Sequence, residues 1–170
     1  ETLTVSGAVR FVFDVRNNPG GEFDSAISLC DLFVEDKMIM YTLDKEGNKK
    51  VYNSKKGACD LPLAVLVNGS TASAAEIFAG SMQANNRAVI VGEKTFGKGV
   101  SQSVQYINML DFSDGALKLT THKNYTPDGK WIHFDYVPGE RNVRYGCSEV
   151  IGKLCVIGSD LDEADIAQLF

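Results

Sequence analysis

The chain has 170 residues, of which 44% are hydrophobic and 23% charged, a composition typical of a single soluble globular domain. It contains no run of about 18 apolar residues, so the sequence predicts no membrane-spanning helix. The net charge of −5 and the pI near 5.0 argue against nucleic acid as the main partner, because nucleic-acid-binding domains are usually basic.

The first half of the chain predicts a strand, a helix and a hairpin. Residues 8–15 form an apolar, β-branched run typical of a buried strand, and the turn-forming sequence RNNPGG follows at 16–21. The apolar spacing of 22–34 predicts a helix. Residues 38–53 are expected to form a β-hairpin that turns at Lys-Glu-Gly-Asn.

A strand–helix–strand unit follows, with a buried strand at 61–69, an Ala-rich helix at 70–85 and a third strand at 87–93. This alternation predicts an α/β domain with a parallel sheet at its centre. Right-handed crossovers bring the carboxyl ends of parallel strands to one edge. We therefore expect the loops NNPGG, NGSTAS and TFGKG to meet at that edge, where open α/β sheets bind ligands.

The rest of the chain predicts two strands, SVQYINML and ALKLTTHKNYT, with a hairpin-like break between them at DFSDG (111–115), and then a turn at TPDGKW. The end of the chain, 159–170, has an acidic first turn and apolar Ile166, Leu169 and Phe170, as expected of a closing helix. Since no repeat or linker interrupts the pattern, we expect 1–170 to form one domain.

The four cysteines leave two interpretations open. They do not form a C-x-x-C pair, and the two histidines do not stand at zinc-ligand spacing to them, so no metal site is predicted. Buried thiols in a reducing compartment and one or two disulfides in an exported protein fit equally well, and a Cys147–Cys155 bridge would close a short loop. The cysteines are Cys30, Cys59, Cys147 and Cys155.

The segment GEKTFGKGVSQ (92–102) is one residue short of a phosphate-binding P-loop. A P-loop needs Ser or Thr after its lysine to bind magnesium, and a helix directly after that. Here Gly99 follows Lys98, and the residues beyond it alternate as in a strand. The sequence therefore argues against phosphate binding.

Ser73 is a candidate nucleophile because it follows a buried strand and begins an Ala-rich helix. A helix amino end offers N–H groups and a positive dipole to a developing oxyanion. Ser73-x-x-Glu76 also matches a capping box, and taken alone a cap is the commoner interpretation.

Lys98 lies on the expected edge and would act as a base if burial lowered its pKa towards about 7–8. His122 and His133 do not follow a predicted parallel strand, so they are expected to be ordinary histidines.

Three blocks, FDVRNNPGG, VNGSTASAAEIFAGSMQANNRAVIVGEKTFGKGVSQ and LKLTTHKNYTPDGK, resemble the signature blocks of the C-terminal processing (tail-specific) serine peptidases over about residues 8–130. The resemblance implies Ser73 as nucleophile, Lys98 as general base and Gln102 as the residue that orients the lysine, with Glu76 in a supporting role. The implied oxyanion hole consists of the backbone N–H groups of Ala74 and of a glycine of NPGG. That glycine is Gly20 or Gly21.

The implied fold is a crotonase/ClpP-like α/β core with β-hairpins, no cofactor or metal, and a protein or peptide substrate. Family members usually carry a PDZ-like domain and further strands, for which this chain has no counterpart, so we expect 1–170 to be the C-terminal part of the protease domain. The segment YVPGERNV (136–143) departs from the family's usual Ile-x-Pro-Asp pattern. The resemblance also implies an extracytoplasmic location, which the sequence itself does not indicate.

Two other functions remain as alternatives. A non-catalytic peptide-binding or scaffold module of the same fold would use Ser73 as a cap and Lys98 as a solvated charge. Acyl-CoA chemistry on the related crotonase fold would require phosphate binding, and few basic residues stand near the glycine-rich loops.

Overall fold

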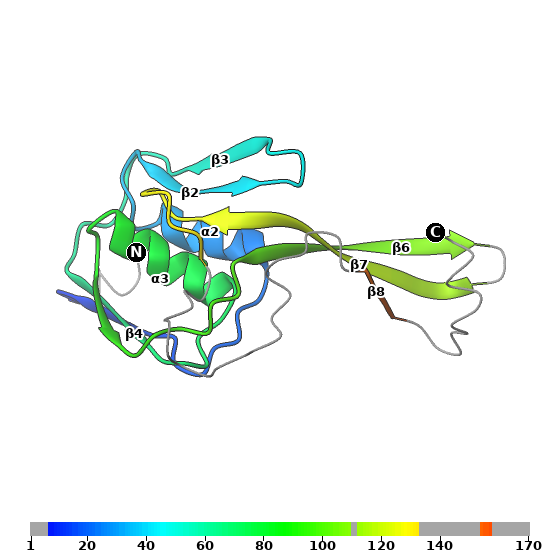
Figure 1. Ribbon diagram of the computed structural model, residues 1–170. Coiled ribbons are helices and arrows are strands. Elements are labelled where there is room, and N and C mark those ends of the chain that lie inside the picture. Colours follow the sequence, from blue (N-terminus) through cyan, green and yellow to red (C-terminus); the bar gives the residue numbers. More distant parts are fainter. Residues whose placement is uncertain (1–6, 110–111, 133–153, 158–170) are drawn as a thin grey trace, which may run out of the picture.

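The computed structural model describes residues 7–109, 112–132 and 154–157, which form a mixed α/β fold with two sheets (Figure 1). In chain order the elements are β1 (Phe11–Asp14), α2 (Phe23–Asp31), β2 (Met38–Leu43), β3 (Lys49–Asn53), β4 (Leu63–Val67), α3 (Ala74–Ala84), β5 (Val89–Gly92), β6 (Val100–Met109), β7 (Phe112–Tyr125) and β8 (Leu154–Ile157).

The first sheet is parallel, with strand order β1-β4-β5. In its register Val65 of β4 lies between Phe13 of β1 and Ile90 of β5. The α2 and α3 helices lie side by side next to this sheet (Figure 1). The predicted α/β arrangement of three parallel strands with crossover helices is confirmed.

Aromatic and aliphatic side chains form the core between this sheet and the helices. The ring of Phe78, on α3, packs edge-to-face on Phe13, with 5.3 Å between centroids, and Phe13 packs in the same way on Phe33 at 5.4 Å. Phe78 is only 2% exposed, and burying a side chain of this size stabilises a fold by about 2–3 kcal/mol. The α3 helix is therefore anchored to β1 near its middle.

Three loops leave the carboxyl ends of the parallel strands: the β1 loop (15–22), the β4 loop (68–73) and the β5 loop (93–99). Backbone hydrogen bonds join them. Ala72 N–H donates to Asn18 O at 2.9 Å, and Phe96 N–H donates to Thr71 O at 2.9 Å. The prediction that these loops meet on one edge is confirmed.

The second sheet has the order β3-β2-β7-β6, and β8 pairs with β7. Its β2–β3 hairpin confirms the prediction for 38–53. The β6–β7 hairpin extends well beyond the helices (Figure 1).

The hairpin predicted between these two strands is confirmed, but the break between them is shorter than the predicted 111–115. Met109 pairs with Phe112 and Ile107 pairs with Gly115, so residues 112–115 belong to β7 and the strands connect through 110–111. Ladder hydrogen bonds along the long hairpin outweigh the local turn preference of Asp and Gly.

Several sequence predictions lie outside the described residues: the closing helix at 159–170, the segment 136–143, and the side chains of His133 and Cys147. Cys30 and Cys59 are free thiols in this structure, so the disulfide interpretation is not supported for them. A Cys147–Cys155 bridge stays a prediction. Among the described helices, none combines the length and the apolar character needed to cross a membrane.

Candidate active site

Ser73 has a backbone conformation that a helix cap does not require. It immediately precedes α3 and has φ 56° and ψ −120°. A residue at this position usually has extended dihedral angles, and a non-glycine residue at positive φ costs about 1–3 kcal/mol. Strained serines at strand-to-helix turns are typical of nucleophiles that must project from a sheet edge. This conformation favours the nucleophile interpretation over the cap alone.

Glu76 holds the Ser73 backbone in place. The Ser73 N–H donates to Glu76 Oε2 at 2.8 Å, and the Glu76 N–H donates to the Ser73 carbonyl oxygen at 2.9 Å. Glu76 is 3% exposed, although it is a carboxylic residue in the first turn of a helix. The sequence predicted this pairing as a capping box, and the structure contains it.

The same carboxylate reaches across to the β5 loop. Glu76 Oε1 accepts the Thr95 hydroxyl at 2.7 Å and the Gly97 N–H at 2.6 Å, and Oε2 accepts the Lys98 N–H at 2.8 Å. Burying a carboxylate costs free energy unless its oxygens are hydrogen-bonded. Here each of the two oxygens accepts two hydrogen bonds, counting the one from the Ser73 N–H. Glu76 therefore joins the backbone of Ser73 to that of Lys98.

The side chains of Lys98 and Gln102 are placed differently from the sequence expectation. Lys98 is partly buried, and within the described residues its ammonium group forms no hydrogen bond or ion pair, with Ser73 or any other residue. Gln102 is exposed, and its Nε2 donates to Thr120 Oγ1 at 3.3 Å. The Ser73–Lys98 hydrogen bond and the orienting role of Gln102 stay predictions.

Gly99 leaves no room for a side chain. A Cβ atom there would lie 1.5 Å from the carbonyl oxygen of Ile132 and 2.3 Å from its carbonyl carbon. The Gly99 carbonyl oxygen accepts the Asn124 N–H and the Trp131 indole N–H, both at 2.9 Å. A serine or threonine of a P-loop does not fit, and β6 begins at Val100 in place of a helix. The argument against a P-loop is confirmed.

Gly20 brings the β1 loop against Ser73. Its φ is +93°, and a Cβ there would lie 2.6 Å from Ala72 O and 2.8 Å from both Ser73 Cβ and Ala74 N. A side chain at Gly20 would therefore separate the two loops. The Gly20 N–H donates to Asn18 Oδ1 at 2.9 Å.

The N–H groups of Gly21 and Ala74 form no hydrogen bond within the described part of the chain. Ala74 is the first residue of α3, so its N–H has no partner inside the helix. Of the two glycines implied by the resemblance, Gly21 is thus the better candidate for an oxyanion donor, because the Gly20 N–H is already engaged.

Residues 1–141 match peptidase family S41. The chain belongs to this family. The carboxyl-terminal-processing protease of Synechocystis sp. is 43% identical over 133 residues, which cover 77% of this chain and 30% of the relative. The carboxy-terminal processing protease CtpA of Bacillus subtilis is 40% identical over 136 residues, which cover 78% of this chain and 28% of the relative.

Solved structures agree with membership of family S41. The photosystem II D1 C-terminal processing protease matches with a TM-score of 0.68 and 34% identity over 78% of this chain and 34% of that protein. A putative S41 protease from Bacteroides fragilis matches with a TM-score of 0.62, and at 21% identity it supports the fold alone. The chain spans about a third, or less, of the length of these three named processing proteases.

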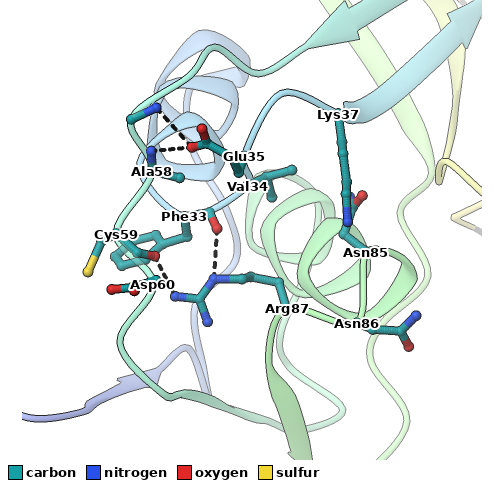
Figure 2. Close-up of a pocket in the computed structure, with 11 residues that line it drawn as sticks. Phe33, Val34, Glu35, Lys37, Ala58, Cys59, Asp60, Asn85, Asn86 and Arg87 are labelled. Atoms are coloured by element: carbon teal, nitrogen blue, oxygen red, sulfur yellow. Dashed lines mark hydrogen bonds between the residues drawn. The ribbon is translucent and has the colours of Figure 1, made fainter.

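Figure 2 shows a pocket of about 480 Å³ in this S41 chain, whose lining includes Asn85, Asn86 and Arg87 just after α3. Ser73 lies at the opposite end of this helix. Arg87 crosses the pocket and donates to the carbonyl oxygens of Phe33, Cys59 and Leu61 at 2.6–2.7 Å. An 11-residue helix is about 16 Å long, so this pocket is separated from the serine by the whole of α3. Its hydrogen bonds connect the end of α2 to the segment before β4.

The sequence did not indicate the roles of two threonines, Thr71 and Thr95, and it predicted His122 to be an ordinary histidine. His122 Nδ1 lies 2.9 Å from the neighbouring Thr121 hydroxyl, on β7, in agreement with an ordinary histidine. Thr95 binds Glu76, and Thr71 is fully buried among the loops. In the sequence each of these loops contains a hydroxyl-bearing threonine, but nothing in the sequence indicates which group that hydroxyl binds.

Proposed function

We propose that this chain forms the catalytic core of a serine endopeptidase that cleaves protein substrates near their carboxyl termini. The observation that carries the proposal is the hydrogen bonding of one buried carboxylate, Glu76, to the backbones of both Ser73 and Lys98. The strained conformation of Ser73 and the named activities of the S41 relatives support it.

In the proposed reaction Ser73 Oγ attacks the scissile carbonyl carbon while Lys98 Nζ takes the hydroxyl proton. The tetrahedral oxyanion accepts hydrogen bonds from the Ala74 and Gly21 N–H groups; loss of one such donor typically lowers kcat by about 10²–10³. The C–N bond then breaks, and Lys98 gives its proton to the leaving amine. Water hydrolyses the acyl-enzyme by the reverse sequence of proton transfers.

The partly buried setting of Lys98 is compatible with this role, since Glu76 contacts only its backbone N–H and leaves the ammonium group out of an ion pair. The proposal includes a rotation of the lysine side chain that brings Nζ to the Ser73 hydroxyl. Gln102, at the start of β6, is proposed to steady the lysine after that rotation.

The proposal extends to the whole protein. A PDZ-like domain outside the matched region would bind the substrate's carboxyl terminus, and the protein would act outside the cytoplasm. Both statements rest on the resemblance to C-terminal processing peptidases.

A fluorophosphonate probe tests the proposal, because it labels a serine only when that serine is activated. In the full-length protein we expect labelling that is lost in Ser73→Ala and reduced at least tenfold in Lys98→Ala. Ser70→Ala, in the same loop and exposed, and Lys94→Ala, in the β5 loop, are the matched controls and should keep the label. Persistent labelling of Ser73→Ala would refute the assignment.

The scaffold alternative is favoured by one observation: among the described residues the Lys98 ammonium forms no hydrogen bond with Ser73, and only the Lys98 backbone N–H is hydrogen-bonded. It predicts an unlabelled wild-type protein that binds peptide equally well with or without the Ser73 hydroxyl. Isothermal titration with an uncleaved peptide, run beside the labelling assay, distinguishes the two functions.

A further inference from the structure

Thr71 is a buried residue that contacts all three loops of the candidate site and has no part in the proposed proton transfers. Its exposed fraction is 0%. The Thr71 hydroxyl donates to the Val15 carbonyl oxygen at 2.8 Å, where β1 ends, and accepts the Asn68 N–H at 3.0 Å, where β4 ends. The Thr71 carbonyl oxygen accepts the Phe96 N–H of the β5 loop at 2.9 Å.

A second connection reinforces the one from the Thr71 hydroxyl. Asn68 Nδ2 donates to Asn17 Oδ1 at 2.9 Å, and the Asn17 N–H donates to Asn68 Oδ1 at 3.0 Å. Asn17 has a φ of 59°, a left-handed conformation that asparagine tolerates better than most residues. These two connections therefore bind the β1 loop to the β4 loop in addition to the backbone hydrogen bond from Ala72 to Asn18.

The two proposed oxyanion donors come from different loops. Gly21 belongs to the β1 loop, and Ala74 directly follows the β4 loop. Their relative position thus depends on how these loops are held together, and not on the geometry of either loop alone. Misplacement of a reacting group by about 1 Å lowers an enzyme's rate by about 100-fold.

We propose that Thr71 is a positioning residue, whose buried hydroxyl sets the β1 loop against the β4 loop so that the Gly21 and Ala74 N–H groups converge on one oxyanion. This inference rests on the proposed serine peptidase function and deepens it. It assigns a role in transition-state binding to a residue that touches neither the substrate nor the reacting atoms.

The substitution Thr71→Val removes the hydroxyl and keeps the size and branching of the side chain, while Thr71→Ser keeps the hydroxyl. A matched control exists in β2. Thr42 is 2% exposed, and its hydroxyl has no hydrogen-bond partner among the described residues. Thr42→Val therefore makes the same chemical change at a buried site outside the loops.

The experiment measures kcat and KM of the full-length protein on a peptide substrate, together with the affinity for a peptide aldehyde. The aldehyde forms a tetrahedral adduct with serine and so reports on the oxyanion hole. For Thr71→Val we expect kcat to fall by about 10- to 100-fold with KM within twofold, and the aldehyde affinity to fall in parallel with kcat. Thr71→Ser should recover kcat to within about threefold, and Thr42→Val should leave it unchanged.

A Thr71→Val protein with wild-type kcat would overturn the inference, provided that Ser73→Ala is inactive in the same assay. Turnover by Ser73→Ala would instead refute the proposed function itself, so the two failures are distinct. If circular dichroism shows that Thr71→Val does not fold, Thr71→Ala replaces it, because it also removes the hydroxyl and adds no atom to the buried site. A kcat about tenfold or more below the wild-type value at unchanged KM then supports the inference, and an unchanged kcat overturns it.

Discussion

Ser73 and Lys98 share one hydrogen-bond acceptor, because Oε2 of Glu76 accepts the backbone N–H of each at 2.8 Å. The two residues are thereby held in fixed proximity through their main chains, while their side chains stay available for chemistry. A backbone connection of this kind places a proposed base next to a proposed nucleophile without consuming the donor and acceptor that the reaction needs.

Glu76→Gln should lower both stability and activity. The amide has one oxygen where the carboxylate has two, and its NH₂ group would face N–H donors of the β5 loop or of Ser73. Leaving buried donors unsatisfied costs about 1–3 kcal/mol, which urea unfolding will measure. Glu93→Gln, at an exposed position of the same loop, is the control. Equal stability of Glu76→Gln and the wild type would contradict the role given to this carboxylate.

Ser73→Gly should be more stable than Ser73→Ala. Both variants lack the hydroxyl, but only glycine adopts φ 56° and ψ −120° without strain. We expect the free energy of unfolding of the glycine variant to exceed that of the alanine variant by about 1 kcal/mol, with neither variant active. An alanine variant as stable as the glycine variant would show that Ser73 is not strained.

Gly99→Ala should destabilise the protein severely. The added methyl group would overlap the backbone carbonyl of Ile132, which a side-chain rotation cannot relieve. We expect a loss of about 3 kcal/mol or a failure to fold, measured by thermal unfolding. The control is Gly69→Ala, where the nearest atom to the new methyl, the Lys94 carbonyl oxygen, is 3.8 Å away. The stability of Gly69→Ala should stay within about 1 kcal/mol of the wild type. An equal loss of stability in Gly69→Ala and Gly99→Ala would contradict the explanation that the Ile132 carbonyl excludes a side chain at position 99.

Stability should fall between pH 9 and pH 12 because of Cys30. Burial raises the pKa of this thiol from 9.0 to about 12. The unfolded chain therefore loses the proton first as the pH rises, so the contribution to stability is complete below pH 9 and decreases above it. The expected decrease is about 1 kcal/mol at pH 10, and it should be missing from Cys30→Ala in urea unfolding at several pH values. If the free energy of unfolding changed with pH in the same way for the wild type and for Cys30→Ala, this prediction would be contradicted.

Much of the fold could be predicted because the parallel strands are short, continuous apolar runs with turn residues after each of them. The hairpin at 38–53 was predicted for the same reason. The hairpin-like break expected at 111–115 was placed too long, since Asp and Gly signal a turn only when the surrounding ladder does not pair them. In β7 the ladder does pair them.

By itself the sequence determined the order of the elements, the edge at which three loops meet, and Ser73 and Lys98 as the candidates for chemistry. The first two conclusions depend on local periodicity and on crossover topology, and the choice of Ser73 and Lys98 depends also on the resemblance to the C-terminal processing peptidases. Only the tertiary structure decided that Glu76 joins Ser73 to Lys98, that Ile132 excludes a side chain at Gly99, and that Thr71 bridges the loops. The physical reason is that a buried polar group must find its partners in space. The Glu76 partner Gly97 is 21 residues away along the chain, and the Thr71 partner Val15 is 56 residues away.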